Sequence, residues 1–235
     1  MRTRLYVAAV IAGLALLVIT VIVVANFGRH DPSPPSLRDD PNPAIPGSII
    51  YLNEEQCIIR AAASGAGSEE EVYCLSRNDY PSEIYFVDDT TILFTRYDSR
   101  GPVLFELDTE TRTIRDLGVQ PTTPKPGGET GLMAPSGEEV FAEYDGRIVI
   151  LKDGTRTTIT EFDTREYGGP SPVTWSPDGQ WILLRYWART HPELWIISRD
   201  GATSGTLTAD ASGSPASWLI PGVGTYPPIP ENYQR

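Results

Sequence analysis

The chain has 235 residues, of which 40% are hydrophobic, and its formal net charge is −12 at pH 7. A surface this acidic repels the phosphate backbone of DNA and RNA, which argues against nucleic-acid binding. The same charge disfavours lying flat on a membrane of anionic lipid.

Residues 5–27 are expected to form a single transmembrane helix that follows a cytoplasmic stub, residues 1–4. No charged residue occurs from Leu5 to Ala25, and at about 1.5 Å per residue this run spans a hydrocarbon core of about 30 Å. Arg2 and Arg4 precede the run, so the positive-inside rule puts the N-terminus in the cytoplasm. A cleaved signal peptide, which would release a soluble secreted domain, is the alternative to an uncleaved anchor.

Residues 28–47 follow as a proline-rich linker. Prolines at six positions favour an extended, semi-rigid spacer that holds the next domain away from the membrane; they are Pro32, Pro34, Pro35, Pro41, Pro43 and Pro46.

Three short apolar runs, residues 49–52, 57–60 and 72–75, predict strands at the start of a domain over residues 48–222. Cys57 and Cys74 are placed symmetrically about the turn 64–67, so they face each other in an antiparallel hairpin of that register. We expect a disulfide between them, which requires an oxidising compartment. Two unpaired cysteines in the core are the alternative.

The segment from Trp175 to Thr208 has the pattern of one complete four-stranded sheet. Ser176-Pro177-Asp178-Gly179 is a turn sequence, and runs of β-branched and aromatic residues follow it on both sides of a second turn. Asp200-Gly201 then marks a third turn. These residues resemble the TolB-type β-propeller repeat, in which an SPDG turn joins the two inner strands and a DG turn precedes the outermost strand.

Two weaker copies of this pattern precede it, beginning at Phe86 and Met133. Pro135 and Gly137 match Pro177 and Gly179 at a spacing of 42 residues, which fits the length of about 40–45 residues per propeller blade. In the copy that begins at Phe86, Arg96-Tyr97 matches Arg185-Tyr186. The repeats therefore predict several similar blades.

A further inner strand is expected at Trp218, with no partner strands after it. The first three strands, conversely, lack an inner strand, and we expect the Trp218 strand to complete their blade and to close the ring. The fold prediction is thus all-β: a four-bladed β-propeller preceded by one transmembrane helix and followed by a tail, residues 223–235. An incomplete ring that pairs with a second copy is the alternative.

Residues that carry chemistry are sparse. The only histidines are His30 and His191, and the sequence has no HExxH, CxxC or G-x-S-x-G motif. We expect no enzymatic activity, no cofactor and no metal. Candidate interaction residues are large or charged side chains at a strand end, in a turn or in the tail; they are Trp187, Arg189, His191, Tyr226 and Tyr233.

Two functions remain open from the sequence. The first is a non-catalytic accessory or scaffold subunit of the cell envelope, tethered to the bilayer by residues 5–27 and bound to other membrane or envelope proteins. The second is a receptor that binds a peptide or a glycan in the propeller channel. Resemblance to TolB implies protein–protein interaction in the envelope. No N-x-[ST] sequon occurs, which favours a bacterial plasma membrane with the propeller on its extracytoplasmic face.

Overall fold

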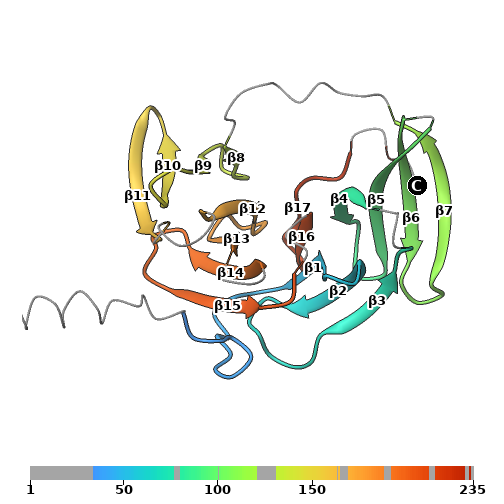
Figure 1. The fold of residues 1–235 in the computed structure, drawn as a ribbon, viewed down its shortest axis with the longest axis horizontal. Helices are drawn as coiled ribbons and strands as arrows, with labels where there is room; N and C mark the ends of the chain where they lie inside the picture. The colour runs from blue at the N-terminus through green and yellow to red at the C-terminus, as the bar shows by residue number, and fades with distance from the viewer. Residues whose placement is uncertain are drawn as a thin grey trace, which may run out of the picture. The chain divides into compact units, whose positions relative to one another are not determined.

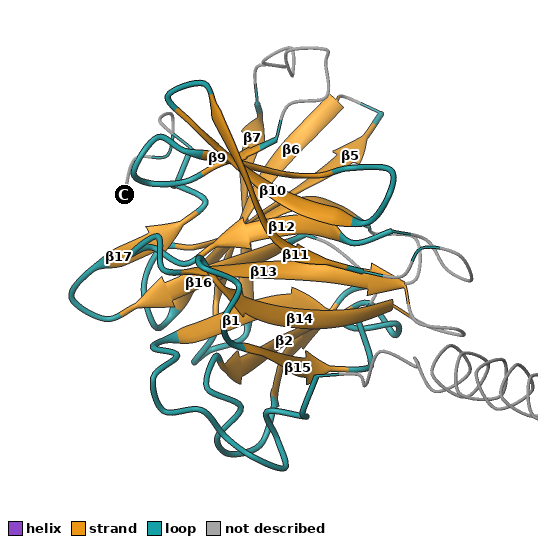
Figure 2. Cartoon of the chain, turned by 90° about the vertical axis from the view of Figure 1, so that its left-hand side faces the viewer, coloured by secondary structure: helices purple, strands orange, loops and turns teal. Residues whose placement is uncertain are grey.

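The computed structural model describes residues 34–76, 80–99, 101–120, 131–162, 164, 169–187, 192–211, 215–230 and 233. The regular structure of these residues consists of β-strands (Figures 1 and 2). No helix among them is long and apolar enough to span a bilayer. The membrane helix expected over residues 5–27 lies outside the described residues.

The strands form four antiparallel sheets. One sheet has the order β17-β16-β1-β2-β3, with β1 at Ser48–Leu52, β2 at Cys57–Ala62, β3 at Glu70–Cys74, β16 at Ala216–Ile220 and β17 at Gly224–Tyr226. We call it the closing sheet. The second runs β4-β5-β6-β7, with β4 at Pro81–Phe86, β5 at Thr91–Asp98, β6 at Gly101–Asp108 and β7 at Thr113–Val119.

The remaining two sheets follow in chain order. The third has the order β11-β10-β9-β8, with β8 at Leu132–Met133, β9 at Glu139–Ala142, β10 at Arg147–Lys152 and β11 at Thr155–Glu161. The fourth runs β12-β13-β14-β15, with β12 at Ser171–Trp175, β13 at Trp181–Trp187, β14 at Pro192–Ser198 and β15 at Ser204–Thr208.

The turn after β12 shows why the sequence folds into hairpins. The buried Ser176 hydroxyl accepts a hydrogen bond of 2.9 Å from the Trp181 amide and donates one of 2.5 Å to the Asp178 carboxylate. Gly179 has a φ of 67°, which a residue with a Cβ adopts only under strain. These contacts fix the turn and therefore the register of β12 against β13.

The predicted pairing of the Trp218 strand with the first strands is confirmed. Strand β16 pairs with β1, with Trp218 opposite Ile49. The Trp218 indole is fully buried, and its Nε1–H donates a hydrogen bond of 2.9 Å to the Pro46 carbonyl. Strands from the two ends of the domain therefore share one sheet, and the buried indole also holds the segment that leads into β1.

Three cores join neighbouring sheets. One lies between the β8–β11 and β12–β15 sheets, one between the β12–β15 and closing sheets, and one between the closing and β4–β7 sheets. The described residues contain no such core between the β4–β7 and β8–β11 sheets. The four sheets are as predicted, but the described residues do not show the closed ring.

One reason is visible in the strand register. Phe86 and Trp175 end the inner strands of their sheets and pair with Ile92 and Ile182, whereas Met133 at the same position pairs with Glu139. A carboxylate replaces a core isoleucine there, and a charged group is costly to bury in a core. The β8–β11 sheet thus has one face that is unsuited to a fourth apolar interface.

Residues 34–47, within the expected spacer, pack on this domain. Ser36 forms a parallel bridge with Thr206, and the side chains of Leu37 and Ile45 are buried in the core between the β12–β15 and closing sheets. Both residues lie among prolines in the sequence, and burying each aliphatic side chain stabilises the packed position of the segment by about 1.5–3 kcal/mol. The segment is therefore anchored by its few aliphatic residues.

Candidate interaction surface

Four large aromatic side chains are exposed at one end of the sheets. Tyr144 is 95% exposed, Tyr80 and Tyr97 are each 66% exposed, and Trp187 is 44% exposed. We call these four residues the aromatic rim. Isolated exposed aromatics are ordinary, but several of them on one surface are a feature of interaction sites.

The strand register places the rim residues at the same end. In the β4–β7 and β12–β15 sheets, Tyr97 and Trp187 lie at the end of the second strand, opposite Pro102 and Pro192. Strands β5 and β13 both end towards the right-hand side of Figure 2. Tyr144 lies in the corresponding turn between β9 and β10, and Tyr80 directly precedes β4. The repeat of the sheet pattern therefore also repeats an aromatic position.

Two arginine side chains near the strand ends lie over aromatic rings, and one of these rings belongs to the rim. Arg96 lies over the Phe105 ring at 4.3 Å from its centroid, and Arg185 lies 6.0 Å from the centroid of Trp187. Burial lowers the pKa of the Arg185 guanidinium, because desolvation disfavours the charged form. A guanidinium over an aromatic face is attracted by the ring quadrupole. Arg185 thus contacts the rim through Trp187, whereas Arg96 contacts the buried Phe105 ring.

A packed aromatic cluster lies on the face of β13 opposite Trp187, because neighbouring side chains of a strand point to opposite faces. The ring centroids of Phe162, Tyr186 and Trp195 lie 4.9–5.2 Å apart. The Trp195 indole also donates a hydrogen bond of 2.6 Å to the Glu193 carboxylate. Aromatic pairs at these separations contribute about 0.5–1.5 kcal/mol beyond their buried area. The strand end that presents Trp187 is therefore rigid.

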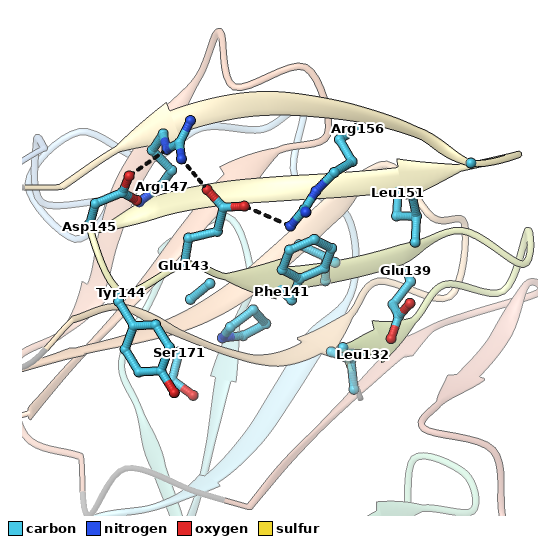
Figure 3. A pocket seen from close by; sticks show the side chains of 15 residues that line it. Leu132, Glu139, Phe141, Glu143, Tyr144, Asp145, Arg147, Leu151, Arg156 and Ser171 are labelled. Carbon is cyan, nitrogen blue, oxygen red and sulfur yellow. Dashed lines mark hydrogen bonds and ion pairs between the residues drawn. The ribbon is translucent and has the colours of Figure 1, made fainter. Parts of the chain in front are cut away.

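A groove of about 1230 Å³ lies on the β8–β11 sheet, next to the rim (Figure 3). Phe141 forms part of its floor, with the Arg156 guanidinium 4.8 Å from the ring centroid. Tyr144 lines the same groove, so the groove and the rim are continuous. The residues that line it are Gly131, Leu132, Glu139, Val140, Phe141, Ala142, Glu143, Tyr144, Asp145, Arg147, Leu151, Gly154, Arg156, Ser171 and Pro172.

Ion pairs bridge the strands along this groove, as Figure 3 shows. The Glu143 carboxylate accepts a hydrogen bond of 2.7 Å from Arg156 and pairs with Arg147 at 2.5 Å. The hydrogen bond from Arg147 holds the pKa of the Asp145 carboxyl below its usual value, and the Asp145 carboxylate raises the pKa of Arg147. These two carboxylates and two guanidinium groups neutralise one another. The groove therefore offers both hydrogen-bond donors and acceptors around an apolar floor.

The structure contains the expected disulfide. Cys57 and Cys74 are bonded across β2 and β3, where they pair directly. The Glu71 carboxylate lies close to both sulfurs, within the distances of a possible metal site. However, metals bind cysteine as the thiolate, and both sulfurs are held in the disulfide. The cluster of Cys57, Glu71 and Cys74 is therefore structural in this oxidation state.

The structure describes three of the five predicted interaction residues, namely Trp187, Tyr226 and Tyr233. Trp187 belongs to the rim, whereas Arg189 and His191 lie outside the described residues. Tyr226 is half-buried in β17, where its hydroxyl donates to the Met133 carbonyl, and its carbonyl accepts a hydrogen bond of 3.3 Å from Thr174. Tyr233 is half-buried against the β4–β7 sheet.

Three rim residues were missed by the sequence analysis. The repeats in the sequence match Tyr97 and Tyr144 with Tyr186, which lies in the packed cluster. In the strand register, however, they follow Ile92 and Glu139 by five residues, as Trp187 follows Ile182. The sequence alignment was thus one residue out of register, and a shift of one residue moves a side chain to the other face of a strand. Tyr80 precedes an inner strand, and only its proximity to Tyr97 in the folded sheet gives it significance.

Comparisons with known proteins add little to this description. No family model matches the chain, and no curated protein sequence matches it. Among solved structures, it is similar to TolB from Acinetobacter baumannii, with 14% identity over 76% of this chain and 49% of that chain and a TM-score of 0.29. It is also similar to the putative TolB from Agrobacterium tumefaciens, with 18% identity over 79% and 68% of the two chains and a TM-score of 0.30.

A third similar structure is that of a nidogen/laminin complex, with 14% identity over 74% of this chain and 70% of that chain and a TM-score of 0.27. This chain spans about half the length of the Acinetobacter protein. Because the identities and TM-scores are low, the description of the fold rests on the strand pairing itself.

Proposed function

We propose that this protein is a non-catalytic interaction module, an accessory or scaffold subunit that binds another envelope protein through the aromatic rim. The observation that carries the proposal is the exposure of Tyr80, Tyr97, Tyr144 and Trp187 at the same end of three sheets. Tyrosine and tryptophan are enriched at the centres of protein interfaces, where they bury a large area at a small cost in conformational entropy.

The rigidity of the rim suits this role. Tyr97 and Trp187 lie within strands, and the face of β13 opposite Trp187 is packed through Tyr186 against Phe162 and Trp195. A surface whose side chains are already ordered loses little entropy on binding. The groove next to Tyr144 extends the surface with charged groups that orient a partner.

The proposed location is the extracytoplasmic face of a bacterial plasma membrane. The apolar sequence over residues 5–27 supports tethering to the bilayer. The disulfide between Cys57 and Cys74 supports an oxidising compartment.

The described residues favour a scaffold over a receptor with a ligand in the channel. Strand β17 lies between β12 and β4 in Figure 1, next to the inner strands of three sheets. Tyr226 bonds to Met133 and Thr174 from there, and its carbonyl accepts a hydrogen bond of 3.2 Å from Ser217. The chain's own residues thus occupy the position where a channel ligand would bind.

The test is gentle detergent extraction of the full-length protein from its native membrane, followed by native mass spectrometry. A stoichiometric complex is expected for the wild type. Tyr97→Ser and Tyr144→Ser should each weaken it about 30-fold, which corresponds to a hot spot of about 2 kcal/mol.

Val223→Ser is the matched control, because Val223 is 58% exposed in the turn between β16 and β17, away from the rim. Rim variants that retain the complex as well as the control does would contradict the proposal. So would a wild-type protein that is extracted only as a monomer.

A further inference from the structure

The face of the β4–β7 sheet that has no neighbouring sheet is covered by the C-terminal segment. Tyr85, Leu93 and Leu104 form a fourth apolar cluster there, and the partly buried side chains of Ile229 and Tyr233 pack against it. At the three other boundaries, this position is filled by side chains from a neighbouring sheet. A short stretch of chain therefore takes the place of a whole sheet.

A directed hydrogen bond accompanies the apolar contact. The Tyr233 hydroxyl donates a hydrogen bond of 2.6 Å to Oε2 of Glu106. Arg115 binds the same carboxylate at 2.8 Å and holds it in place. A positioned carboxylate beside an apolar surface distinguishes a tyrosine from a phenylalanine. The site thus selects both an aliphatic side chain and a phenol.

The described residues after β17, 227–230 and 233, show no ladder of backbone hydrogen bonds to a neighbouring strand. Pro227, Pro228 and Pro230 have no N–H to donate, so this part of the chain cannot continue the pairing of β17 with β16. Ile229 and Tyr233 are only half-buried. A segment with few buried contacts and few backbone hydrogen bonds detaches at a low free-energy cost.

We propose that this face of the β4–β7 sheet is a peptide-binding site, which the chain's own Ile229 and Tyr233 occupy in competition with a partner. The ligand class is an extended segment that carries prolines, an aliphatic residue and, four residues after it, a tyrosine. Leu93 of this site and Tyr97 of the rim face the same side of β5, but the site has residues of its own and does not depend on the function proposed for the rim.

The experiment measures binding of a synthetic peptide, residues 227–235 with a fluorescent label at its N-terminus, by fluorescence anisotropy. The receptor is the otherwise full chain ended after Tyr226, which keeps β17. It should bind the peptide saturably. The intact chain should bind it at least tenfold more weakly, because a tethered competitor has an effective concentration in the millimolar range.

Two altered peptides test the contacts. The Tyr233→Phe peptide should bind about tenfold more weakly, which is the loss expected for one hydrogen bond to a charged group. The Ile229→Ala peptide should bind more weakly by a similar factor, because it loses most of its aliphatic contact. A peptide with the same composition in scrambled order is the control and should not bind.

A folded truncated chain that binds no peptide would overturn the proposal, and so would equal affinity for the intact and truncated chains. If the truncated chain does not fold, the intact Tyr233→Phe variant provides the test. Its own segment should be the weaker competitor, so it should bind the labelled peptide more tightly than the wild type does. No increase in affinity would then refute the competition.

Discussion

Trp218→Ala should lower the free energy of unfolding by about 4–5 kcal/mol. The indole is fully buried between the β12–β15 and closing sheets, where a tryptophan-to-alanine change costs about 3–5 kcal/mol in transfer and cavity energy. Its hydrogen bond to the Pro46 carbonyl adds a net contribution of about 1 kcal/mol. The hydrogen bond contributes no more than this, because Pro46 is only half-buried and water can donate to its carbonyl once the indole is removed.

The assay is thermal unfolding of the full-length protein, followed by far-ultraviolet circular dichroism. For a domain of this size, about 1 kcal/mol corresponds to 2–4 °C in Tm, so the midpoint should fall by about 10–15 °C. Trp218→Phe retains an aromatic ring and should lose only about 1–2 kcal/mol.

Trp187→Ala is the matched control, because this tryptophan is 44% exposed and its truncation should change Tm by no more than a few degrees. If Trp218→Ala unfolds at the same temperature as Trp187→Ala, the assignment of Trp218 as the residue that fastens the two ends of the domain is wrong.

Three further predictions concern stability. Replacing Cys57 and Cys74 by serine should cost about 3 kcal/mol, because their bond closes a loop between positions 17 residues apart; two free thiols in non-reducing mass spectrometry of the native protein would contradict the bond. Glu138→Gln should cost about 1–3 kcal/mol, since this buried carboxylate pairs with the partly exposed Arg199; an unchanged urea midpoint would show that the pair contributes nothing. Burial raises the pKa of Tyr51 to about 12, against about 10 when unfolded, so folding favours the neutral phenol and stability should be lost as pH rises from 10 towards 12. In urea titrations over this pH range, Tyr51→Phe should lose less stability as the pH rises than the wild type does. An equal loss in both proteins would contradict the role of the Tyr51 phenol.

Local sequence patterns were sufficient to predict the strand pairing. Cys57 pairs with Cys74 as their symmetry about the turn indicated, although the hairpin has a bulge between Ile58 and Ile59. The pairing of Trp218 with Ile49 also followed from counting strands at the two ends of the domain. The first pairing is encoded by a turn and its flanking apolar residues within a few tens of residues, whereas the second follows from the repeat pattern of the whole domain.

Contacts between sheets were harder to predict, because they depend on faces that meet only after folding. Glu139, at a position where Ile92 and Ile182 are buried, was the sequence signal that one interface is missing. The burial of Leu37 was hidden among prolines, where one aliphatic residue has no periodic neighbour to mark it. Exposure of Tyr144 depends on the position at which β9 ends, and the boundaries of strands are the least certain part of a pattern.

The central claim is that the aromatic rim binds a partner protein, and site-specific photo-crosslinking in the native membrane tests it most directly. A photoreactive phenylalanine analogue would replace Tyr97, Tyr144 or, as the control, Val223. The account predicts that the two rim positions crosslink to the same protein and that position 223 does not. A crosslink from position 223 alone, or none from either rim position, would contradict the claim.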